Sequence, residues 1–263
     1  MSKSQYIIKN VSKFYELDNG KHTVLKNISL NLDTQDITVI LGESGCGKTT
    51  LLRIIANLED ASEGEIQYIK DGSQHVPRVG VVFQESRLMP WLNVSENIAF
   101  YEKKHDSVFK RFKKILHLEN FKDDYADVDK YLEMMKLTKF RNLYPHELSG
   151  GMAQRVSIAR ALYSDPDILL MDEPFSALDY FTRMDMQNEI IKIHKTTNKG
   201  IIFVTHDIDE AIKIAGKIII FTKNYEMKEF KIKQCSDKDY TDDYLINLKK
   251  EILNSLHHAP HGI

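Results

Sequence analysis

The segment DITVILGESGCGKTT, residues 36–50, decides the fold class. Its first half, DITVILG, is an apolar and β-branched run that ends in glycine, which is typical of a buried parallel strand. Its second half, GESGCGKTT, matches the pattern G-x-x-x-x-G-K-[ST] of a phosphate-binding loop. The residues that follow, TTLLRIIANL, have helical spacing, so the loop stands between a strand and a helix as the motif requires. We therefore predict an α/β fold with a phosphate-binding loop.

The loop itself predicts how a nucleotide is bound. Its backbone N–H groups would point at the β-phosphate, and a side chain at Gly45 or Gly47 would obstruct that approach. Lys48 is placed to reach the β- and γ-phosphates, and the Thr49 hydroxyl to bind Mg²⁺. Cys46 is interpreted as a small loop residue and not as a redox centre. The predicted ATP-binding residues of the loop are Gly42, Glu43, Ser44, Gly45, Cys46, Gly47, Lys48, Thr49 and Thr50.

Composition narrows the possible classes of protein. The chain has 263 residues, of which 42% are hydrophobic and 28% charged, as in an ordinary soluble globular protein. A net charge of −2 gives no general basic field, so nucleic acid is not an expected partner. Cys46 and Cys235 have no disulfide or metal-site spacing, and no apolar run has the length of a signal peptide or a membrane span. We expect a chain that neither crosses a membrane nor leaves the cytoplasm by itself.

The remaining pattern predicts a layered domain with an insertion. Residues 6–15 and 24–32 alternate apolar and polar side chains like half-exposed antiparallel strands, whereas residues 61–66, ASEGEI, have the composition of a turn. Further strands are predicted at 79–84, 167–173, 200–207 and 217–222, with a helix at 177–197. Helical segments without buried-strand runs are predicted at 94–104, 107–121 and 127–137.

These elements define the domain organisation that we predict. An ATPase domain spans residues 1–222; its core and β subdomain comprise 1–93 and 165–222, and a helical subdomain comprises 94–164. Residues 223–263 form a C-terminal extension. Within it, YTDDYLINLKKEILNSL could form an amphipathic helix that packs on the core or on a partner.

Four polar residues at the ends of predicted strands are candidates for the chemistry. Asp172 ends an apolar strand, where an aspartate would hold the Mg²⁺ hydration shell. Glu173 follows and should point in a different direction, so it could orient or deprotonate the attacking water. His206, one strand further along, could touch the γ-phosphate and couple it to Glu173. Gln84, at the end of the strand 79–84, could contact the metal or the water.

The segment HELSGGMAQR, residues 146–155, contains a second candidate phosphate site. A Ser-Gly-Gly triplet stands before what reads as a long helix, and Gln154 and Arg155 are predicted to begin that helix. Backbone N–H groups and a helix N-terminus that converge on one point favour an anion. One small chain therefore has two predicted phosphate-binding elements.

Taken in order, these motifs resemble the ATP-binding cassette (ABC) ATPases over residues 5–222. The resemblance implies a P-loop NTPase with a RecA-like core, an N-terminal antiparallel β subdomain and an inserted helical signature subdomain. It implies that Tyr15 stacks on adenine, with Phe14 as the neighbouring candidate. It also implies a head-to-tail homodimer, in which Ser149, Gly150 and Gly151 bind the ATP of the partner subunit. Asp179, in the segment SALD, would then lie on the seam between the two sites.

A finer resemblance concerns the importers for nitrate, sulfonates and taurine, in which a Leu-Leu-Pro-Trp run follows the glutamine. This chain has Leu88, Met89, Pro90 and Trp91 there, and Ala153 where a basic residue often follows LSGGM. The resemblance implies an ATP-hydrolysing subunit at the cytoplasmic face of the membrane, with permease subunits and an extracytoplasmic substrate-binding protein as partners. Thiamine precursors and riboflavin are alternative cargoes.

Other interpretations stay open at this level. Residues 85–100 are a candidate groove for a permease, although Met89 and Trp91 could equally belong to a local core. A soluble ABC ATPase would more often have two cassettes, an exporter a fused membrane domain, and a P-loop kinase no LSGGM segment. The sequence favours an importer subunit over these classes.

Overall fold

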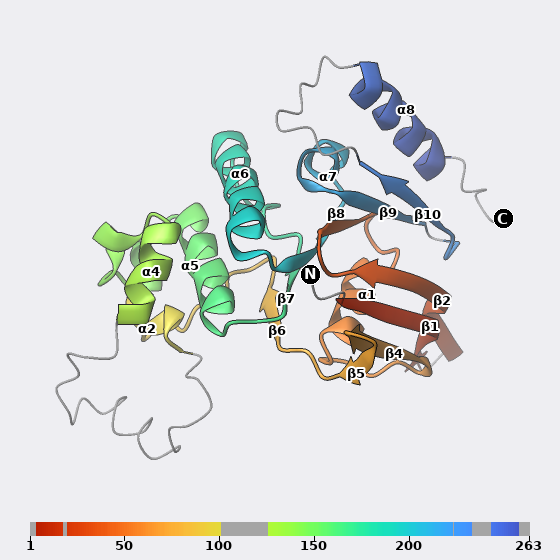
Figure 1. The fold of residues 1–263 in the computed structure, drawn as a ribbon, viewed down its shortest axis with the longest axis horizontal. Helices are drawn as coiled ribbons and strands as arrows, with labels where there is room; N and C mark the ends of the chain where they lie inside the picture. Colours follow the sequence, from red (N-terminus) through yellow and green to blue (C-terminus); the bar gives the residue numbers. More distant parts are fainter. Residues whose placement is uncertain (1–3, 18–19, 101–125, 223, 233–242, 258–263) are drawn as a thin grey trace. The chain divides into compact units, whose positions relative to one another are not determined.

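A computed structural model describes residues 4–17, 20–100, 126–222, 224–232 and 243–257 (Figure 1). The chain divides into two compact units, each described here by itself. The first unit comprises Met1–Val81, Asp167–Glu173 and Gln187–Ile263, and the second comprises Val82–Pro166 and Pro174–Met186. None of the helices in the described ranges combines the length and the apolar composition that a membrane span requires.

The first sheet of the first unit is antiparallel, with the strand order β2-β1-β4-β5. The two predicted strands are confirmed as β1 (Ser4–Leu17) and β2 (Gly20–Asp33). The prediction missed β4 (Glu63–Lys70) and β5 (Ser73–His75), which begin within and after the stretch read as a turn. Gly64 accounts for the turn-like composition, because it has a φ of +82° at the start of β4. Pairing with β1 makes the segment a strand.

The second sheet has the order β10-β9-β3-β8-β7-β6 and is parallel at its centre. Strands β3, β7, β8 and β9 confirm the predicted buried runs, and β7 and β3 both pair in parallel with β8. Four of the six strands have the following bounds: β3 Ile37–Leu41, β7 Ile168–Asp172, β8 Gly200–Thr205 and β9 Lys217–Phe221. The edge strands are β6 (Val79–Val82) and β10 (Met227–Lys231). Since β10 pairs with β9, the part of the chain after residue 222 contributes a strand to this sheet.

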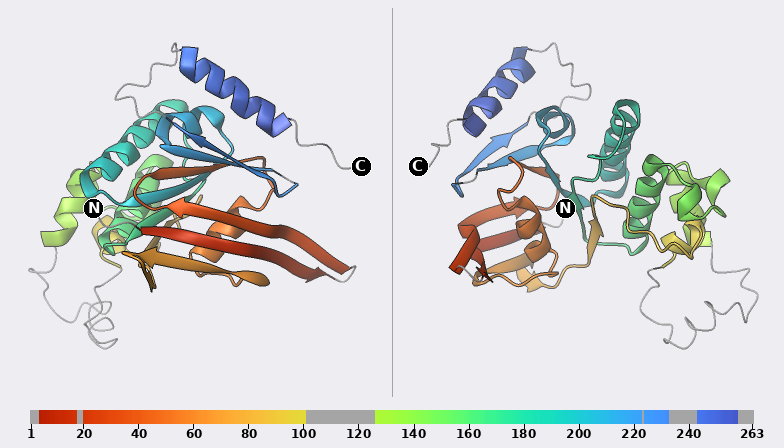
Figure 2. Two further views of the ribbon diagram at one scale, coloured as in Figure 1. Left: turned by 45° about the vertical axis from the view of Figure 1, so that its right-hand side comes forward. Right: turned by 180° about the vertical axis from the view of Figure 1, so that it is seen from behind.

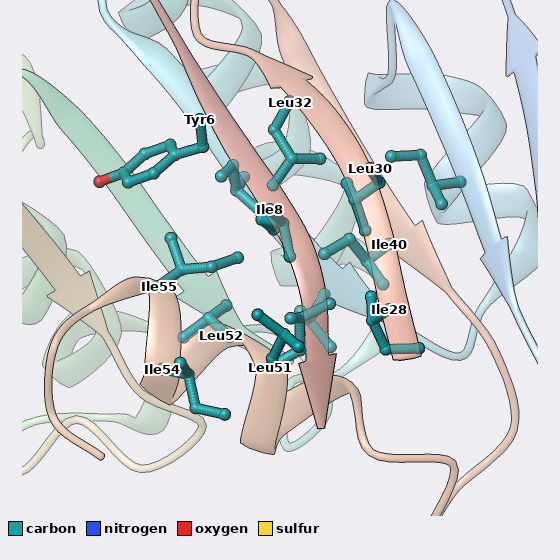
Figure 3. Packing of buried hydrophobic residues seen from close by; sticks show 14 of the residues in the cluster. Tyr6, Ile8, Ile28, Leu30, Leu32, Ile40, Leu51, Leu52, Ile54 and Ile55 are labelled. Atoms are coloured by element: carbon teal, nitrogen blue, oxygen red, sulfur yellow. The ribbon is translucent and has the colours of Figure 1, made fainter. Parts of the chain in front are cut away.

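One apolar core joins the two sheets and helix α1 (Lys48–Ile55) of the first unit. Leu51, Leu52 and Ile55 of α1 face Ile8 of β1 and Ile28 of β2, and all five side chains are at most 4% exposed (Figure 3). Burial of such side chains is the main source of stability in a fold of this kind. The core therefore fixes α1, and the loop that precedes it, against the sheets.

Two further helices of the first unit lie near the second sheet. Helix α7 (Ile208–Ile214) follows β8, and α8 (Asp243–His257) lies beside α7 and β9 (Figure 2). The inward face of α8 carries Leu245, Leu248 and Ile252, and Lys249 bonds Asp209 at the start of α7. The predicted amphipathic C-terminal helix is thus confirmed, and it packs on the core.

The second unit is helical in its described part. Its helices are α2 (Val94–Ile98), α4 (Ala126–Met134) and α5 (Gly150–Tyr163), with single 3₁₀ turns at Thr138–Phe140 and Pro145–Glu147. The predicted helix 107–121 lies outside the described residues. Helix α6 (Tyr180–Thr197) starts in the second unit and continues into the first. The predicted fold class, a P-loop NTPase with an antiparallel sheet, a parallel core and helical segments, is confirmed.

Candidate functional site

The phosphate-binding loop leaves β3 at Leu41 and enters α1 through Gly47. Gly47 has a φ of +98°, and a Cβ there would lie 2.8 Å from both Leu25 Cδ2 and the Val24 carbonyl oxygen. Only glycine satisfies both conditions. At Gly45, which has a φ of +83°, a Cβ would meet no protein atom within 4 Å. Within this chain, glycine is therefore favoured there by the backbone conformation alone.

Lys48 folds back into its own loop. Its Nζ donates to the carbonyl oxygens of Gly42 at 2.9 Å and Glu43 at 2.8 Å, and the residue is only 4% exposed. A buried ammonium needs acceptors, and these two carbonyls supply them. The ammonium is thereby held inside the loop Gly42–Thr50.

Thr49 and Asp172 meet across the first unit. The Thr49 hydroxyl donates to Asp172 Oδ1 at 2.9 Å, although 123 residues separate them. Asp172 is 9% exposed, and its burial raises the pKa of the carboxyl above its usual value. An alcohol and a carboxylate oxygen at this distance are the hard ligands that Mg²⁺ prefers, and a cation would offset the desolvation of the carboxylate. The two side chains therefore fit a magnesium site.

Glu173 turns away from Asp172 because its backbone is left-handed, with a φ of 43°. Its N–H donates to the Val204 carbonyl at 3.0 Å, which ties the turn to the neighbouring strand β8. One carboxylate oxygen lies 2.9 Å from His206 Nδ1 and the other 3.9 Å from Lys48 Nζ. A non-glycine residue in this region stores strain, and such residues cluster at functional sites.

His206 follows β8, and the structure brings it together with Glu173 as predicted. Its side chain is 52% exposed, whereas that of Glu173 is 17% exposed. The chain turns into α7 directly afterwards, where the Asp207 carboxylate caps the helix by accepting from Glu210 N at 3.1 Å. The rigid cap fixes the point at which the imidazole leaves the backbone.

Tyr15 lies in β1 and is anchored by a residue that the prediction missed. Its hydroxyl donates to the carboxylate of Glu59, which follows α1, and Lys13 pairs with the same carboxylate at 3.1 Å. The hydrogen bond to Glu59 raises the pKa of Tyr15. Phe14 has the Lys21 ammonium 3.4 Å from its ring centroid. Tyr15 is 38% exposed, and the choice between the two rings as the adenine contact stays a prediction.

In the second unit, Ser149 is the N-cap of α5, and its Oγ accepts from Met152 N at 3.2 Å. The helix begins at Gly150, so the prediction that Gln154 and Arg155 begin it is wrong. The glycines occupy the first turn, where backbone N–H groups have no partner within the helix. Gly150 is exposed and Gly151 is buried. The N–H groups that could bind an anion are therefore those at the N-terminus of α5.

Asp179 caps the start of α6 in the same unit. Its Oδ1 accepts from Thr182 N at 3.1 Å, and hydrogen bonding to Thr182 lowers the pKa of the Asp179 carboxyl. A Cβ on Gly151 would lie 2.5 Å from Thr182 Cγ2. The first turns of α5 and α6 are therefore in contact.

Gln84 lies in a bend two residues after the end of β6, not at the end of the strand as predicted. The strand is shorter because β6 is an edge strand and has a partner on one side only. Gln84 is exposed, and its proposed contact with metal or water stays a prediction.

The segment after Gln84 is held by hydrogen bonds from half-buried Arg160 and buried Asn97, which the sequence did not reveal. Arg160 of α5 donates to the Ser86 and Arg87 carbonyls, both at 2.9 Å. Asn97 of α2 is 0% exposed, accepts from Met89 N, and donates to the carbonyls of Met89, Leu92 and Asn93. Trp91, inside this clamped loop, is 66% exposed. The alternative that Trp91 is part of a local core is therefore wrong.

Comparisons with known proteins agree with this geometry. The family model described as "ABC transporter" matches residues 25–176. The chain is 44% identical over 220 residues to the "Aliphatic sulfonates import ATP-binding protein SsuB" of a Bacillus cereus strain, covering 82% of this chain and 80% of that one. It is 39% identical to the "Uncharacterized ABC transporter ATP-binding protein MJ0412" of Methanocaldococcus jannaschii, covering 95% and 90% of the two chains.

A solved structure is also similar. The ATP-binding cassette MJ0796, described as a dimer in a post-hydrolysis state bound to ADP and Pi, matches with a TM-score of 0.69 and 32% identity. The match covers 88% of this chain and all of that one. These similarities agree with the phosphate-binding loop and with the cluster of Asp172, Glu173 and His206. They show that the chain belongs to the ABC transporter family and is an ATP-binding, ATP-hydrolysing subunit of that family's type.

Proposed function

We propose that the chain is the ATPase subunit of an importer for aliphatic sulfonates or a related small anion. The observation that carries the catalytic part is the pairing of Glu173 with His206 beside Lys48 at the carboxyl ends of parallel strands. Ligands of α/β sheets bind at that edge. The loop residues Gly42–Thr50 would bind the phosphates, with Tyr15 stacked on adenine.

Each side chain of the cluster has a proposed role. Thr49 and Asp172 are the residues that would hold Mg²⁺, and the bound ion would supply neutralisation of charge on the phosphates. Glu173 accepts a proton from the attacking water as a general base. His206, at 2.9 Å from that carboxylate, positions it and donates toward the γ-phosphate.

A second copy of the chain would complete the site. The first turn of α5, with Ser149, Gly150 and Gly151, would present its N–H groups to the nucleotide of the partner subunit, with Asp179 at the seam. Positive partial charge at a helix terminus stabilises the transferred phosphate. Support comes from the dimer reported for the similar cassette MJ0796.

Transport would follow from coupling to a permease at the cytoplasmic face of the membrane, with an extracytoplasmic substrate-binding protein delivering the cargo. The clamped loop that exposes Trp91 is the surface that we assign to the permease. The names of relatives at about 40% identity support sulfonates as cargo. Taurine and nitrate belong to the same class of small anions, and thiamine precursors and riboflavin are the alternatives.

The catalytic proposal is tested with Glu173→Gln. The variant should bind ATP, form an ATP-dependent dimer in sedimentation velocity, and lose ATPase activity by a factor of about 10² or more. Glu65→Gln is the matched control, because Glu65 is an exposed glutamate of the same unit that pairs only with Lys9 and Gln67 among the described contacts. Retention of hydrolysis by Glu173→Gln, or the absence of an ATP-dependent dimer, would refute the proposal.

The cargo is tested with the complete importer in proteoliposomes. ATP-driven uptake of radiolabelled ethanesulfonate is expected, and Glu173→Gln is the inactive control. Taurine, nitrate, thiamine and riboflavin are offered in parallel. Uptake of thiamine or riboflavin without uptake of any of the three anions would contradict the anion assignment and leave the ATPase assignment intact.

A further inference from the structure

The first turn of α6 exposes two adjacent aromatic side chains. Tyr180 is 68% exposed and Phe181 is 79% exposed, and their rings contact edge to face at 5.5 Å between centroids. Met184, one turn later, is 38% exposed. No other segment in the described part of the chain has three large apolar residues exposed within five positions. Concentrated apolar surface of this kind is typical of an interaction site.

This aromatic pair is held in place by its surroundings. Asp179, directly before it, caps α6 through Thr182 N, so the backbone of the turn is fixed. Side chains of tyrosine and phenylalanine lose little conformational freedom when they are buried, and each can bury about 150 Å² or more. A pre-organised aromatic pair is suited to act as an interface anchor.

The pair also adjoins the first turn of α5. A Cβ on Gly151 would lie 2.5 Å from Thr182, the residue after Phe181, and a Cβ on Gly150 would lie 3.9 Å from Leu178 Cδ2. These contacts are all within the second unit. The surface that carries Ser149 and Gly150 therefore continues directly onto the aromatic pair.

We infer that Tyr180 and Phe181 anchor the interface with a second copy of this chain. The inference rests on the proposed function, in which the first turn of α5 faces the nucleotide of the partner. A surface that closes over a partner at Gly150 must also approach it at the adjoining turn of α6. The occupant is then a second copy, and the interface gains a fully desolvated aromatic centre beside the polar nucleotide contacts.

The test uses Glu173→Gln as the parent, so that ATP is bound and not consumed. Tyr180→Ser and Phe181→Ser are added together, and the dimer dissociation constant is measured by sedimentation with saturating ATP. We expect the constant to rise about tenfold or more, as for the loss of an interface anchor. Binding of a fluorescent ATP analogue to the monomer should stay within about twofold of the parent, because the loop of the first unit is unchanged.

Phe140→Ser in the same parent is the matched control. Phe140 is an aromatic residue of the second unit at 37% exposure, in the 3₁₀ turn Thr138–Phe140. It should leave the dimer constant unchanged. An unchanged constant in the Tyr180 and Phe181 variant, or an equal rise in the control, would overturn the inference.

A second variant tests the inference without relying on correct folding of the double mutant. Phe181→Cys in the parent is labelled with an environment-sensitive dye, and ATP alone should shift its emission to shorter wavelength. A shift that requires the permease would overturn the inference in favour of a permease contact. If the parent itself fails to dimerise with ATP, the proposed function fails before the inference is reached.

Discussion

Replacing Asn97 with alanine should release the loop that presents Trp91. Asn97 makes four hydrogen bonds, but the carbonyls of Met89 and Asn93 have second donors in Leu92 N and Asn97 N. Met89 N and the Leu92 carbonyl have no other bond among the described residues. A polar group that loses its partner costs about 1 to 3 kcal/mol, and the lower end applies to each of these two because Met89 and Leu92 are only half-buried, so the loop should lose about 2 kcal/mol.

Hydrogen exchange followed by mass spectrometry measures this loss of local stability directly. At about 2 kcal/mol, protection of the Met89 amide should fall about thirtyfold. The affinity for ATP should change less than about twofold, since the nucleotide loop belongs to the other unit. Transport and permease-stimulated ATPase activity should fall, because Trp91 would no longer be presented in one conformation.

Ser95→Ala is the matched control. Ser95 is also buried in α2, and its hydroxyl donates to the Arg141 carbonyl at 3.1 Å, but that carbonyl also accepts from Ser95 N. Loss of the Ser95 hydroxyl leaves the Arg141 carbonyl paired and should cost about 1 kcal/mol or less. Unaltered protection of Met89 in Asn97→Ala, or equal deprotection by Ser95→Ala, would refute the reasoning.

Three further predictions concern the nucleotide site. His206→Ala should lower kcat about 10²-fold or more with ATP affinity nearly unchanged, and His206→Gln should restore part of it if the imidazole acts by positioning Glu173. Asp172→Asn should raise the Tm of the nucleotide-free protein near pH 7 and abolish Mg²⁺-dependent hydrolysis. Because burial raises the pKa of Asp172, its ionisation opposes folding, so the gain should shrink as pH falls through that raised pKa and vanish below about 3.9. Gly47→Ala should destabilise the fold by about 2 kcal/mol or more in urea titrations, through its positive φ and the contact with Leu25.

The features that the sequence predicts well are those that depend on local pattern. The glycine loop, the apolar run into Asp172 and the run into His206 each carry their own strand or helix signal, and strand ends in a parallel sheet meet at one edge. Because that edge is common to β3, β7 and β8, Lys48, Glu173 and His206 had to converge once the topology was right.

The features that the sequence misses depend on partners distant along the chain. Strand β4 exists through its pairing with β1, and β10 through its pairing with β9, so neither is visible in its own segment. Glu59 is an ordinary acid after a helix until Tyr15 reaches it. The start of α5 was placed too late because two glycines weaken the helical pattern, although Ser149 is a standard cap.

The divergence of the two acids at the end of β7 has a definite backbone cause. Asp172 is still in the strand and directs its carboxylate to Thr49 of α1, 2.9 Å away. Glu173 enters the left-handed region with a φ of 43°, while its N–H remains bonded to Val204 of the neighbouring strand. The chain therefore turns at a fixed point, and the second carboxylate reaches His206 instead of Thr49. A residue that relaxed to an ordinary φ would lose that direction, so the strain at Glu173 is what would separate the acid that we propose as a metal ligand from the adjacent acid that we propose acts on water.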